Sequence, residues 1–390
     1  MKVLVTATDG FGGHGGIALY VRNLLTALCA HPRRPEVLAI PRVMPFASES
    51  RPTNLEWDTS GLGGKPQYAA AVLRTLLQRG PFDAVLCAHI NLLPLAYLTA
   101  RRYRAPLALF IYGNDAKKPP RRALAHRLVS RTDGIVSIRR HTTRALQAWA
   151  NIYETPNYLL ENAVDLSRYG MGAKDPKLVS RLGLTGKRVV MTLSRLGEAY
   201  VGVDEVMEAL VLLPPQANDI VYLVVGGGPD LPRLRQKARS LGLEGRVVFA
   251  GFVPDEAKAD YYRLADVFAM PGSGPTFDRY PLRFVFLEAM ACGVPVVGAR
   301  CEDEAERAAD GALLAAQVDP HDSKAIAEAI LGALKMPKRV PPGLERFGYA
   351  SFEQRCHGIL DQIFAARTPP QAPAMGGRDQ PVKRAIGSRL

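Results

Sequence analysis

Two residues in the second half of the chain have side chains that suit chemistry on a phosphorylated ligand. Arg195 follows closely after the apolar run Val189 to Leu193, and Glu288 lies four residues into the apolar stretch that begins at Phe284. A cation beyond the end of a strand can stabilise developing negative charge, and a carboxylate can accept hydrogen bonds from both hydroxyls of a vicinal diol. The structural alternatives are a surface ion pair for Arg195 and an exposed helix charge for Glu288.

Two glycine clusters follow strand-like runs and could bring the backbone close to a ligand. The first ends in Gly15 and Gly16 and opens a helical pattern, where free N–H groups and the helix dipole can bind a phosphate. It can equally be a tight turn, because its match to the dinucleotide-binding pattern is poor. The second cluster follows the run Val221 to Val225 and consists of Gly226, Gly227 and Gly228.

The first half adds a histidine and a concentration of positive charge. His89 stands at the end of the run Ala84 to Cys87, as a site residue or as a satisfied structural histidine. Residues 1–165 hold 21 Lys and Arg against 11 Asp and Glu, and most of the excess lies between Arg101 and Arg144. This basic patch either contacts anionic lipid or polyprenyl diphosphate or is a solvated face. No nucleic-acid recognition motif accompanies it, so we expect no nucleic-acid partner.

The elements that must position these residues alternate between strand and helix. A length of 390 residues indicates two domains, and the alternation restarts after about residue 170. We therefore expect an α/β protein with two doubly wound, Rossmann-like domains, whose ligand lies in the cleft beyond the carboxyl ends of the strands. The predicted segments are 1–165, 166–345, a helix at 346–366 that returns to the first domain, and a disordered basic tail at 367–390.

Composition excludes several classes of protein. The five cysteines are widely spaced without a C-x-x-C pair, which indicates buried thiols rather than disulfides or zinc. No apolar run is long enough to span a bilayer, and the apolar start is too short for a signal peptide. We expect a cytoplasmic chain with no bound metal.

Several blocks in order carry a resemblance to a known family. They are Leu193 to Leu196, Gly251 to Val253, Met270 to Ser273 and Leu282 to Val297, with Leu160 to Leu166 as a linker. Their order and spacing resemble glycosyltransferase family 4, the retaining enzymes of glycosyl transferases group 1, whose architecture is GT-B. The resemblance covers Lys2 to Arg367. It implies a donor-binding second domain, an acceptor-binding first domain and no metal or cofactor.

The resemblance assigns roles to individual residues. Arg195 matches the family arginine that contacts the donor diphosphate, and Glu288 matches the glutamate that holds the ribose hydroxyls. Around them the donor site is expected to include Gly15, Gly16, Gly226, Gly227, Gly228, Phe252, Val253, Tyr280, Leu282, Arg283 and Leu287. On the acceptor side the resemblance points to Tyr112, Asn114 and Asp115.

Three positions depart from the family pattern. Val201 stands where a lysine is usual, Tyr280 stands where the first of two glutamates is usual, and Tyr112 replaces a histidine. Arg283 and Asp278 are the candidates to supply the missing cation and carboxylate, and we count them with Arg195 and His89 as candidate catalytic residues.

The sequence thus predicts a retaining hexosyltransferase that uses a UDP- or GDP-linked sugar. Its acceptor is a glycan or a polyprenyl-diphosphate-linked lipid, as in bacterial exopolysaccharide, O-antigen or glycolipid assembly. The basic patch predicts a peripheral contact with the inner face of an anionic membrane. The alternative is a catalytically impaired relative that binds a nucleotide sugar and activates a partner enzyme.

Overall fold

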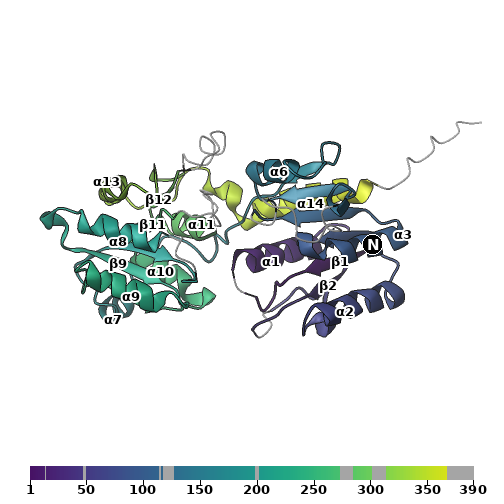
Figure 1. Cartoon of the computed structure of the whole chain (residues 1–390), viewed down its shortest axis with the longest axis horizontal. Helices are drawn as coiled ribbons and strands as arrows, with labels where there is room; N and C mark the ends of the chain where they lie inside the picture. Colours follow the sequence, from purple (N-terminus) through teal and green to yellow (C-terminus); the bar gives the residue numbers. More distant parts are fainter. Residues whose placement is uncertain are drawn as a thin grey trace, which may run out of the picture.

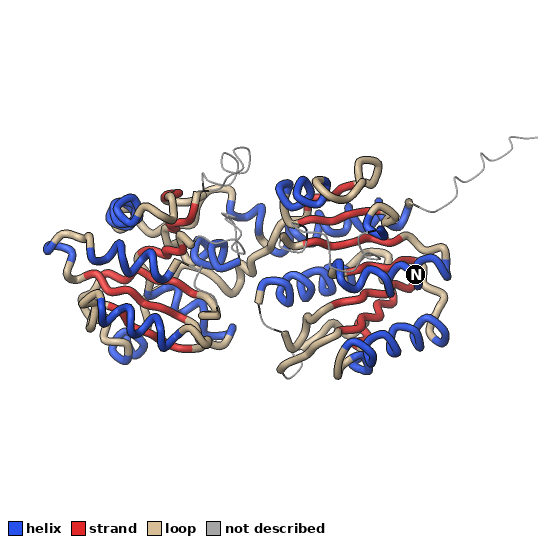
Figure 2. Tube along the Cα trace, in the orientation of Figure 1, coloured by secondary structure: helices blue, strands red, loops and turns tan. Residues whose placement is uncertain are grey.

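The computed structural model of the chain describes residues 1–13, 15–46, 50–113, 116, 127–197, 202–272, 284–300 and 313–366. Within these ranges the chain forms two lobes, each built on a parallel sheet with helices on both faces (Figures 1 and 2). The predicted α/β class with two doubly wound domains is therefore confirmed.

The N-terminal lobe contains a seven-stranded sheet of order β3-β2-β1-β4-β5-β6-β7. Its strands are β1 (Lys2–Ala7), β2 (Glu36–Pro41), β3 (Leu55–Trp57), β4 (Ala84–Cys87), β5 (Leu107–Ile111), β6 (Gly134–Ser137) and β7 (Asn157–Leu159). The described helices are α1 (Gly16–Cys29), α2 (Lys65–Gln78), α3 (Leu93–Tyr103) and α6 (Arg140–Gln147), with short 3-10 turns η1 (Thr59–Gly61) and η2 (Ile90–Leu92).

The C-terminal lobe contains a six-stranded sheet of order β10-β9-β8-β11-β12-β13. Its strands are β8 (Arg188–Leu193), β9 (Ile220–Val225), β10 (Val247–Gly251), β11 (Val267–Met270), β12 (Val296–Ala299) and β13 (Ala316–Val318). The described α-helices that follow in the chain are α7 (Pro176–Arg181), α8 (Val203–Val211), α9 (Leu231–Ser240), α10 (Lys258–Leu264), α11 (Phe284–Ala291), α13 (Ser323–Ala333) and α14 (Tyr349–Ala365), of which α14 packs on the N-terminal lobe. Three 3-10 turns join them, namely η3 (Pro215–Ala217), η4 (Asp255–Ala257) and η5 (Leu344–Phe347).

Hydrophobic patterning explains why these segments adopt these structures. All residues of β4, β5 and β9 are buried, as expected for central strands covered on both faces. In α1 the buried residues Val21, Leu24, Leu25 and Leu28 recur at helical spacing and pack against the first sheet. Apolar clusters fill both faces of each sheet, so the loops at the strand ends are held by a rigid frame.

The chain crosses between the lobes twice at one place. The amide of Val164, in the first crossing, donates to the carbonyl of Phe347, which ends η5 before the return, at 2.8 Å. Beyond that point α14 lies against α1, and its buried residues Phe352, Cys356, Leu360 and Ile363 join the core of the N-terminal lobe (Figure 1). The predicted tail at 367–390 lies outside the described residues.

Four short strands were not predicted from the sequence. Strands β3, β6, β7 and β13 have only three or four residues, which is too short for a recognisable alternation. Four cysteines are buried thiols, and Cys301 lies outside the described residues. Among the helices of the described part, none is both long and apolar enough to cross a membrane.

Candidate active site

The candidate residues gather at the carboxyl ends of both sheets, next to the strand pairs where the winding direction reverses. In the first sheet this pair is β1 and β4, and in the second it is β8 and β11. Asp9 and His89 follow the first pair, while Arg195 and Gly272 follow the second. Ligands of doubly wound sheets bind at such positions, because neighbouring loops separate there and leave a crevice.

Glycines in the second lobe are required by close backbone packing. A Cβ on Gly226 would lie 1.7 Å from the Ser194 carbonyl oxygen, and one on Gly228 would lie 2.1 Å from that of Leu196. Both glycines also have positive φ, of 136° and 157°. The Leu196 amide donates to the Gly227 carbonyl at 2.9 Å, so the two loops are joined on both sides of Arg195.

Arg195 is held by its backbone alone. Its side chain is exposed, and it forms no ion pair or hydrogen bond with any residue that the structure describes. Arg188, at the opposite end of β8, is instead paired with Asp219 by two hydrogen bonds of 2.6 and 2.7 Å. Arg195 therefore presents a guanidinium whose donors are available to a phosphate.

Glu288 is not the exposed helix charge that its structural alternative describes. Its residue is only 3% exposed, and its Oε2 accepts a hydrogen bond from the Tyr262 hydroxyl at 2.7 Å. Burial raises the pKa of the Glu288 carboxyl above its ordinary value, while Lys258, Tyr262 and Tyr169 favour the ionised form. The carboxylate lies inside its lobe, within a polar pocket of the core.

The other predicted donor residues surround this edge in different ways. Phe252 follows β10 and is 68% exposed, with its Cβ 3.7 Å from the position of a Cβ on Gly227. Val253 and Leu287 are buried in the core of the lobe, so their side chains can only support the site.

The N-terminal glycine loop faces the second lobe. Gly15 has φ 103° and caps α1, and a Cβ on Gly16 would lie 3.6 Å from the Phe284 ring. Phe284 begins α11, the helix that carries Glu288. A second contact joins Arg22 of α1 to Asp255 of η4 at 3.5 Å. The first turns of α1 and the donor half of the site are thus brought together.

The first sheet contributes polar side chains to its own edge. The Nδ1 atom of His89 accepts from the Asn91 amide at 3.1 Å, which caps η2 and leaves the ring proton on Nε2. Asp9 is close enough to His89, Arg22 and Arg42 to interact electrostatically, and burial raises the pKa of its carboxyl. The Tyr112 ring packs edge-on against Tyr20, with centroids 5.2 Å apart.

Six predicted site residues lie outside the described residues, and their roles stay predictions. They are Asn114 and Asp115 on the acceptor side and Asp278, Tyr280, Leu282 and Arg283 on the donor side. Among the described residues, no three His, Cys, Asp or Glu side chains form a cluster suited to a metal.

Sequence reasoning missed four residues that the structure places at or beside the site. Asp9 could have been found, because it follows the first strand directly. Tyr262 was missed because a tyrosine beside buried residues looks like core, whereas Tyr169, three residues beyond the linker block Leu160 to Leu166, could have been found from its position. Arg22 was hidden on a helix whose other residues pack inward.

A cavity of about 700 Å³ lies at the opposite edge of the first sheet and is not part of this site. It is lined by residues at the amino ends of the strands, among them Lys2, Glu36 and Leu55. Two of its basic side chains already have partners, because Lys2 Nζ donates to the Arg79 carbonyl and Arg79 is paired with Glu56.

Two facing doubly wound lobes with a crevice edge on each define the GT-B class. The two lobes match separate family models, "Glycosyltransferase Family 4" over residues 14–168 and "Glycosyl transferases group 1" over residues 187–336. The chain belongs to glycosyltransferase family 4, as its motifs predicted.

Two related proteins are similar in sequence to a part of this chain. The GDP-mannose-dependent α-(1-6)-phosphatidylinositol monomannoside mannosyltransferase of Mycolicibacterium smegmatis is 35% identical over 231 residues, which cover 57% of this chain and 58% of the relative. The D-inositol 3-phosphate glycosyltransferase of Rhodococcus opacus is 29% identical over 69% of this chain and 61% of its own. The chain thus matches little more than half of the length of these relatives.

Solved structures agree in fold. HepE of Anabaena, determined with UDP and glucose, has a TM-score of 0.72 at 22% identity, covering 93% of this chain and 100% of that one. The sucrose-phosphate synthase of Thermosynechococcus elongatus also has a TM-score of 0.72, at 18% identity, covering 94% and 100% of the two chains. The GT-B prediction is confirmed.

Proposed function

We propose that this protein transfers a hexose from a nucleoside diphosphate sugar to an acceptor hydroxyl, with the donor in the C-terminal lobe and the acceptor in the N-terminal lobe. The observation that carries the proposal is the exposed Arg195 guanidinium, held between glycine loops at the same sheet edge as the Glu288 pocket. A cation that has no partner among the described residues, at such an edge, is suited to a diphosphate.

The reaction breaks the bond between the sugar C1 and the diphosphate oxygen and forms the bond between C1 and the acceptor oxygen. The nucleoside diphosphate leaves with the electron pair, and the acceptor hydroxyl gives its proton to the departing diphosphate oxygen. Arg195 stabilises the charge that develops on the leaving group, and Glu288 accepts hydrogen bonds from the ribose. The proposal includes retention at C1 and needs no metal, as the family resemblance implies.

GDP-mannose is the donor to test first, because the mannosyltransferase from M. smegmatis is named for it. UDP-glucose is the second, because HepE was solved with UDP and glucose. Arg283 and Asp278 remain the candidates for the cation and the carboxylate missing at Val201 and Tyr280.

The surface of the N-terminal lobe favours a lipid-linked acceptor. Leu98, Arg101 and Arg102 share the exposed face of α3, and Leu98 is 48% exposed. The neighbouring α2, whose Leu76 carbonyl accepts from the Tyr103 hydroxyl, exposes Leu77 by 78%. Arginines beside exposed leucines suit the cytoplasmic face of an anionic membrane. The glycolipid in the name of the M. smegmatis relative supports such an acceptor.

The competing proposal is a nucleotide-sugar-binding scaffold that activates a partner enzyme. It is supported by the valine at position 201 and the tyrosine at 280, which remove a cation and a carboxylate that are usual in the family. The two proposals agree on binding and differ on turnover.

Calorimetric titration with GDP and UDP, followed by turnover assays with GDP-mannose and UDP-glucose, separates them. We expect binding of one nucleotide and slow hydrolysis or transfer of its sugar, with the product anomer identified by NMR. Binding without any turnover, in the presence of lipid extracts as acceptors, would favour the scaffold. Failure to bind either nucleotide contradicts both.

A further inference from the structure

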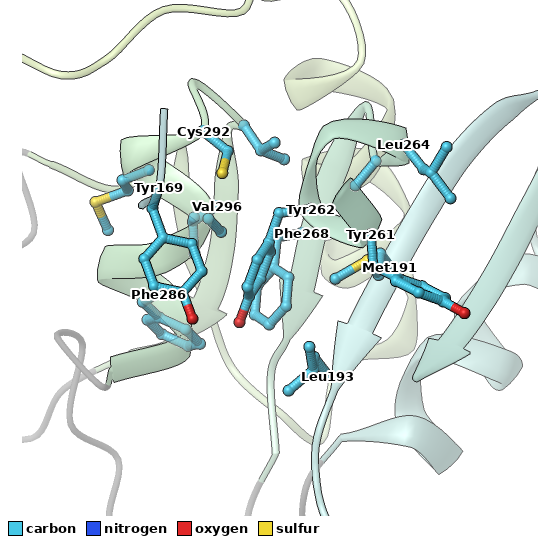
Figure 3. Packing of buried hydrophobic residues seen from close by; sticks show 14 of the residues in the cluster. Tyr169, Met191, Leu193, Tyr261, Tyr262, Leu264, Phe268, Phe286, Cys292 and Val296 are labelled. Atoms are coloured by element: carbon cyan, nitrogen blue, oxygen red, sulfur yellow. The ribbon is translucent and has the colours of Figure 1, made fainter. Parts of the chain in front are cut away.

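Two tyrosines from separate segments lie at the Glu288 carboxyl. Tyr262 of α10 donates a hydrogen bond to it at 2.7 Å, and Tyr169, from the segment that links the lobes, is near enough to favour its ionised form and so to lower its pKa. The two rings lie edge to face with centroids 5.9 Å apart. Figure 3 shows both hydroxyl oxygens pointing to the same end of the cluster.

Packing alone gives no reason for this polar group. The ring of its partner Tyr262 packs against Phe268, which packs in turn against Phe286, and both phenylalanines are at most 2% exposed. A leucine at position 288 would fill such a site without the cost of burying a carboxylate, which is several kcal/mol for an unpaired ion. Buried ionisable groups with dedicated partners at a cleft occur preferentially at functional sites.

We propose that Tyr262 and Tyr169 are positioning residues of the donor site, which orient the Glu288 carboxylate and keep it ionised so that it can accept both ribose hydroxyls. The inference rests on the proposed function, since it takes Glu288 as the ribose acceptor. It adds two residues that act through Glu288 rather than on the substrate.

Hydrogen-bond capacity supports this assignment. An ionised carboxylate has about four acceptor positions on its two oxygens. The Tyr262 hydroxyl uses one of them, and even with a second taken by the nearby Tyr169 two are left for a vicinal diol. A protonated carboxyl would convert one oxygen into a donor and lose that match.

Other charged groups near Glu288 either favour or oppose the ionised form of its carboxyl. Lys258 favours the carboxylate, while Asp255 opposes it. Lys258 is itself paired with Asp255 at 2.5 Å, which reduces its effect. The tyrosine hydroxyls therefore stabilise the ionised form in a site where burial opposes it.

Tyr169 joins the surroundings of Glu288 to the segment that links the two lobes. Its amide donates to the Asp165 carbonyl at 2.9 Å, and Asp165 follows Val164, which is bonded to Phe347 where the chain crosses between lobes. The orientation of the carboxylate is consequently fixed in part by the segment that joins the two lobes.

The test compares Tyr262→Phe and Tyr169→Phe with a matched control. Tyr222→Phe removes a hydroxyl that is equally buried in the same lobe but is bonded to Thr192 Oγ1 at 2.6 Å. Affinity is measured for the nucleoside diphosphate that binds and for its 2′,3′-dideoxy form. We expect Tyr262→Phe to weaken binding of the ribonucleotide about tenfold and to leave the dideoxy form unchanged, because only the ribose hydroxyls require the carboxylate.

The inference would be overturned if Tyr262→Phe weakened binding of both nucleotides equally. It would also be overturned if the Tyr222→Phe control lost as much affinity for the ribonucleotide as Tyr262→Phe. A second measurement does not depend on ligand binding. Carboxyl NMR titration should place the pKa of Glu288 higher in Tyr262→Phe than in the wild type, since a donor to the ionised form is lost. If the wild type binds no nucleotide, the proposed function fails, and an unchanged Glu288 titration in the variant then rejects the role of the tyrosines as well.

Discussion

The two sheets share a strand order around their first strand, yet their carboxyl ends are built differently. In the C-terminal lobe the loops after β8, β9 and β10 are joined by backbone contacts, with Gly226 and Gly228 against Ser194 and Leu196. In the N-terminal lobe the loops after β1 and β2 are also joined through the backbone, by hydrogen bonds from Val43 to Thr8 and from Phe46 to Gly12. That edge carries in addition a group of charged or titratable side chains, Asp9, His89 and Arg42, which the C-terminal glycine loop lacks.

This difference fits the two substrates of the proposed function. A nucleoside diphosphate is the same in every turnover, so a backbone-defined site suits it. Side chains can be replaced without altering the strands, so the acceptor edge can change while the fold stays intact. The comparison predicts that backbone changes are severe in the donor half and that charge changes are moderate in the acceptor half.

The largest effect is expected from Gly226→Ala. The added Cβ would meet the Ser194 carbonyl oxygen at 1.7 Å, in a backbone conformation of φ 136° that alanine rarely adopts. We expect destabilisation of about 4 kcal/mol or more, together with loss of nucleotide binding, because the Arg195 loop must move. Thermal unfolding and calorimetry measure the two.

Gly227→Ala is the matched control one residue away. Its Cβ would be 3.7 Å from the nearest heavy atoms, those of Phe252, which is an ordinary contact. We expect a change in stability within about 1 kcal/mol. Equal damage from both substitutions would show that the glycine loop is not fixed by its contact with Ser194 and Leu196.

The second prediction separates the two ends of β8. Arg195→Ala should lower turnover about a hundredfold to a thousandfold with little change in stability, because its guanidinium has no partner in the described structure to lose. Arg188→Ala removes the pair with Asp219, whose side chain is 40% exposed, and should change stability by about 1 kcal/mol or less without affecting turnover. Steady-state rates and melting curves decide it, and normal turnover in Arg195→Ala would contradict the proposed role.

The same contrast explains what the sequence could predict. Arg195, the glycine turn and Glu288 follow long apolar runs, so their positions beyond strands and on a helix could be predicted. The burial of Glu288 could not, because its partners Tyr262 and Tyr169 are 26 and 119 positions away along the chain. The charges around Asp9 are those of Arg22, Arg42 and His89, which lie in α1, after β2 and after β4. Contacts of that kind depend on how the strands are ordered, which no local pattern records.

Asp9→Asn should have a smaller effect, raising stability at pH 7 while weakening the use of the acceptor. Burial raises the pKa of Asp9 in the folded protein, against the favourable charges of His89, Arg22 and Arg42. The contribution of the protonated carboxyl is complete below about pH 4 and is lost as pH rises through the folded pKa. Asparagine cannot ionise, so the variant should melt above the wild type at pH 7, and the difference should shrink at pH 4.

The functional part of this prediction concerns the acceptor. We expect the acceptor KM of Asp9→Asn to rise about tenfold, as for one lost charged hydrogen bond, with the donor KM unchanged. A rise in the donor KM instead would place Asp9 on the other substrate and remove the contrast between the two edges.

The smallest effect concerns the outer face of α3, where charge is expected to act without any built site. Arg101 shares that face with the exposed Leu98 and Arg102, and a single basic residue near an anionic surface contributes about 1 kcal/mol. Arg101→Ala should therefore weaken binding to vesicles rich in anionic lipid about fivefold at low salt, and the difference should vanish at high salt because the interaction is screened. Arg239→Ala, at an exposed arginine on α9 of the other lobe, is the control and should leave vesicle binding unchanged. Equal losses from both variants would mean that net charge, rather than this face of the acceptor lobe, governs the attraction.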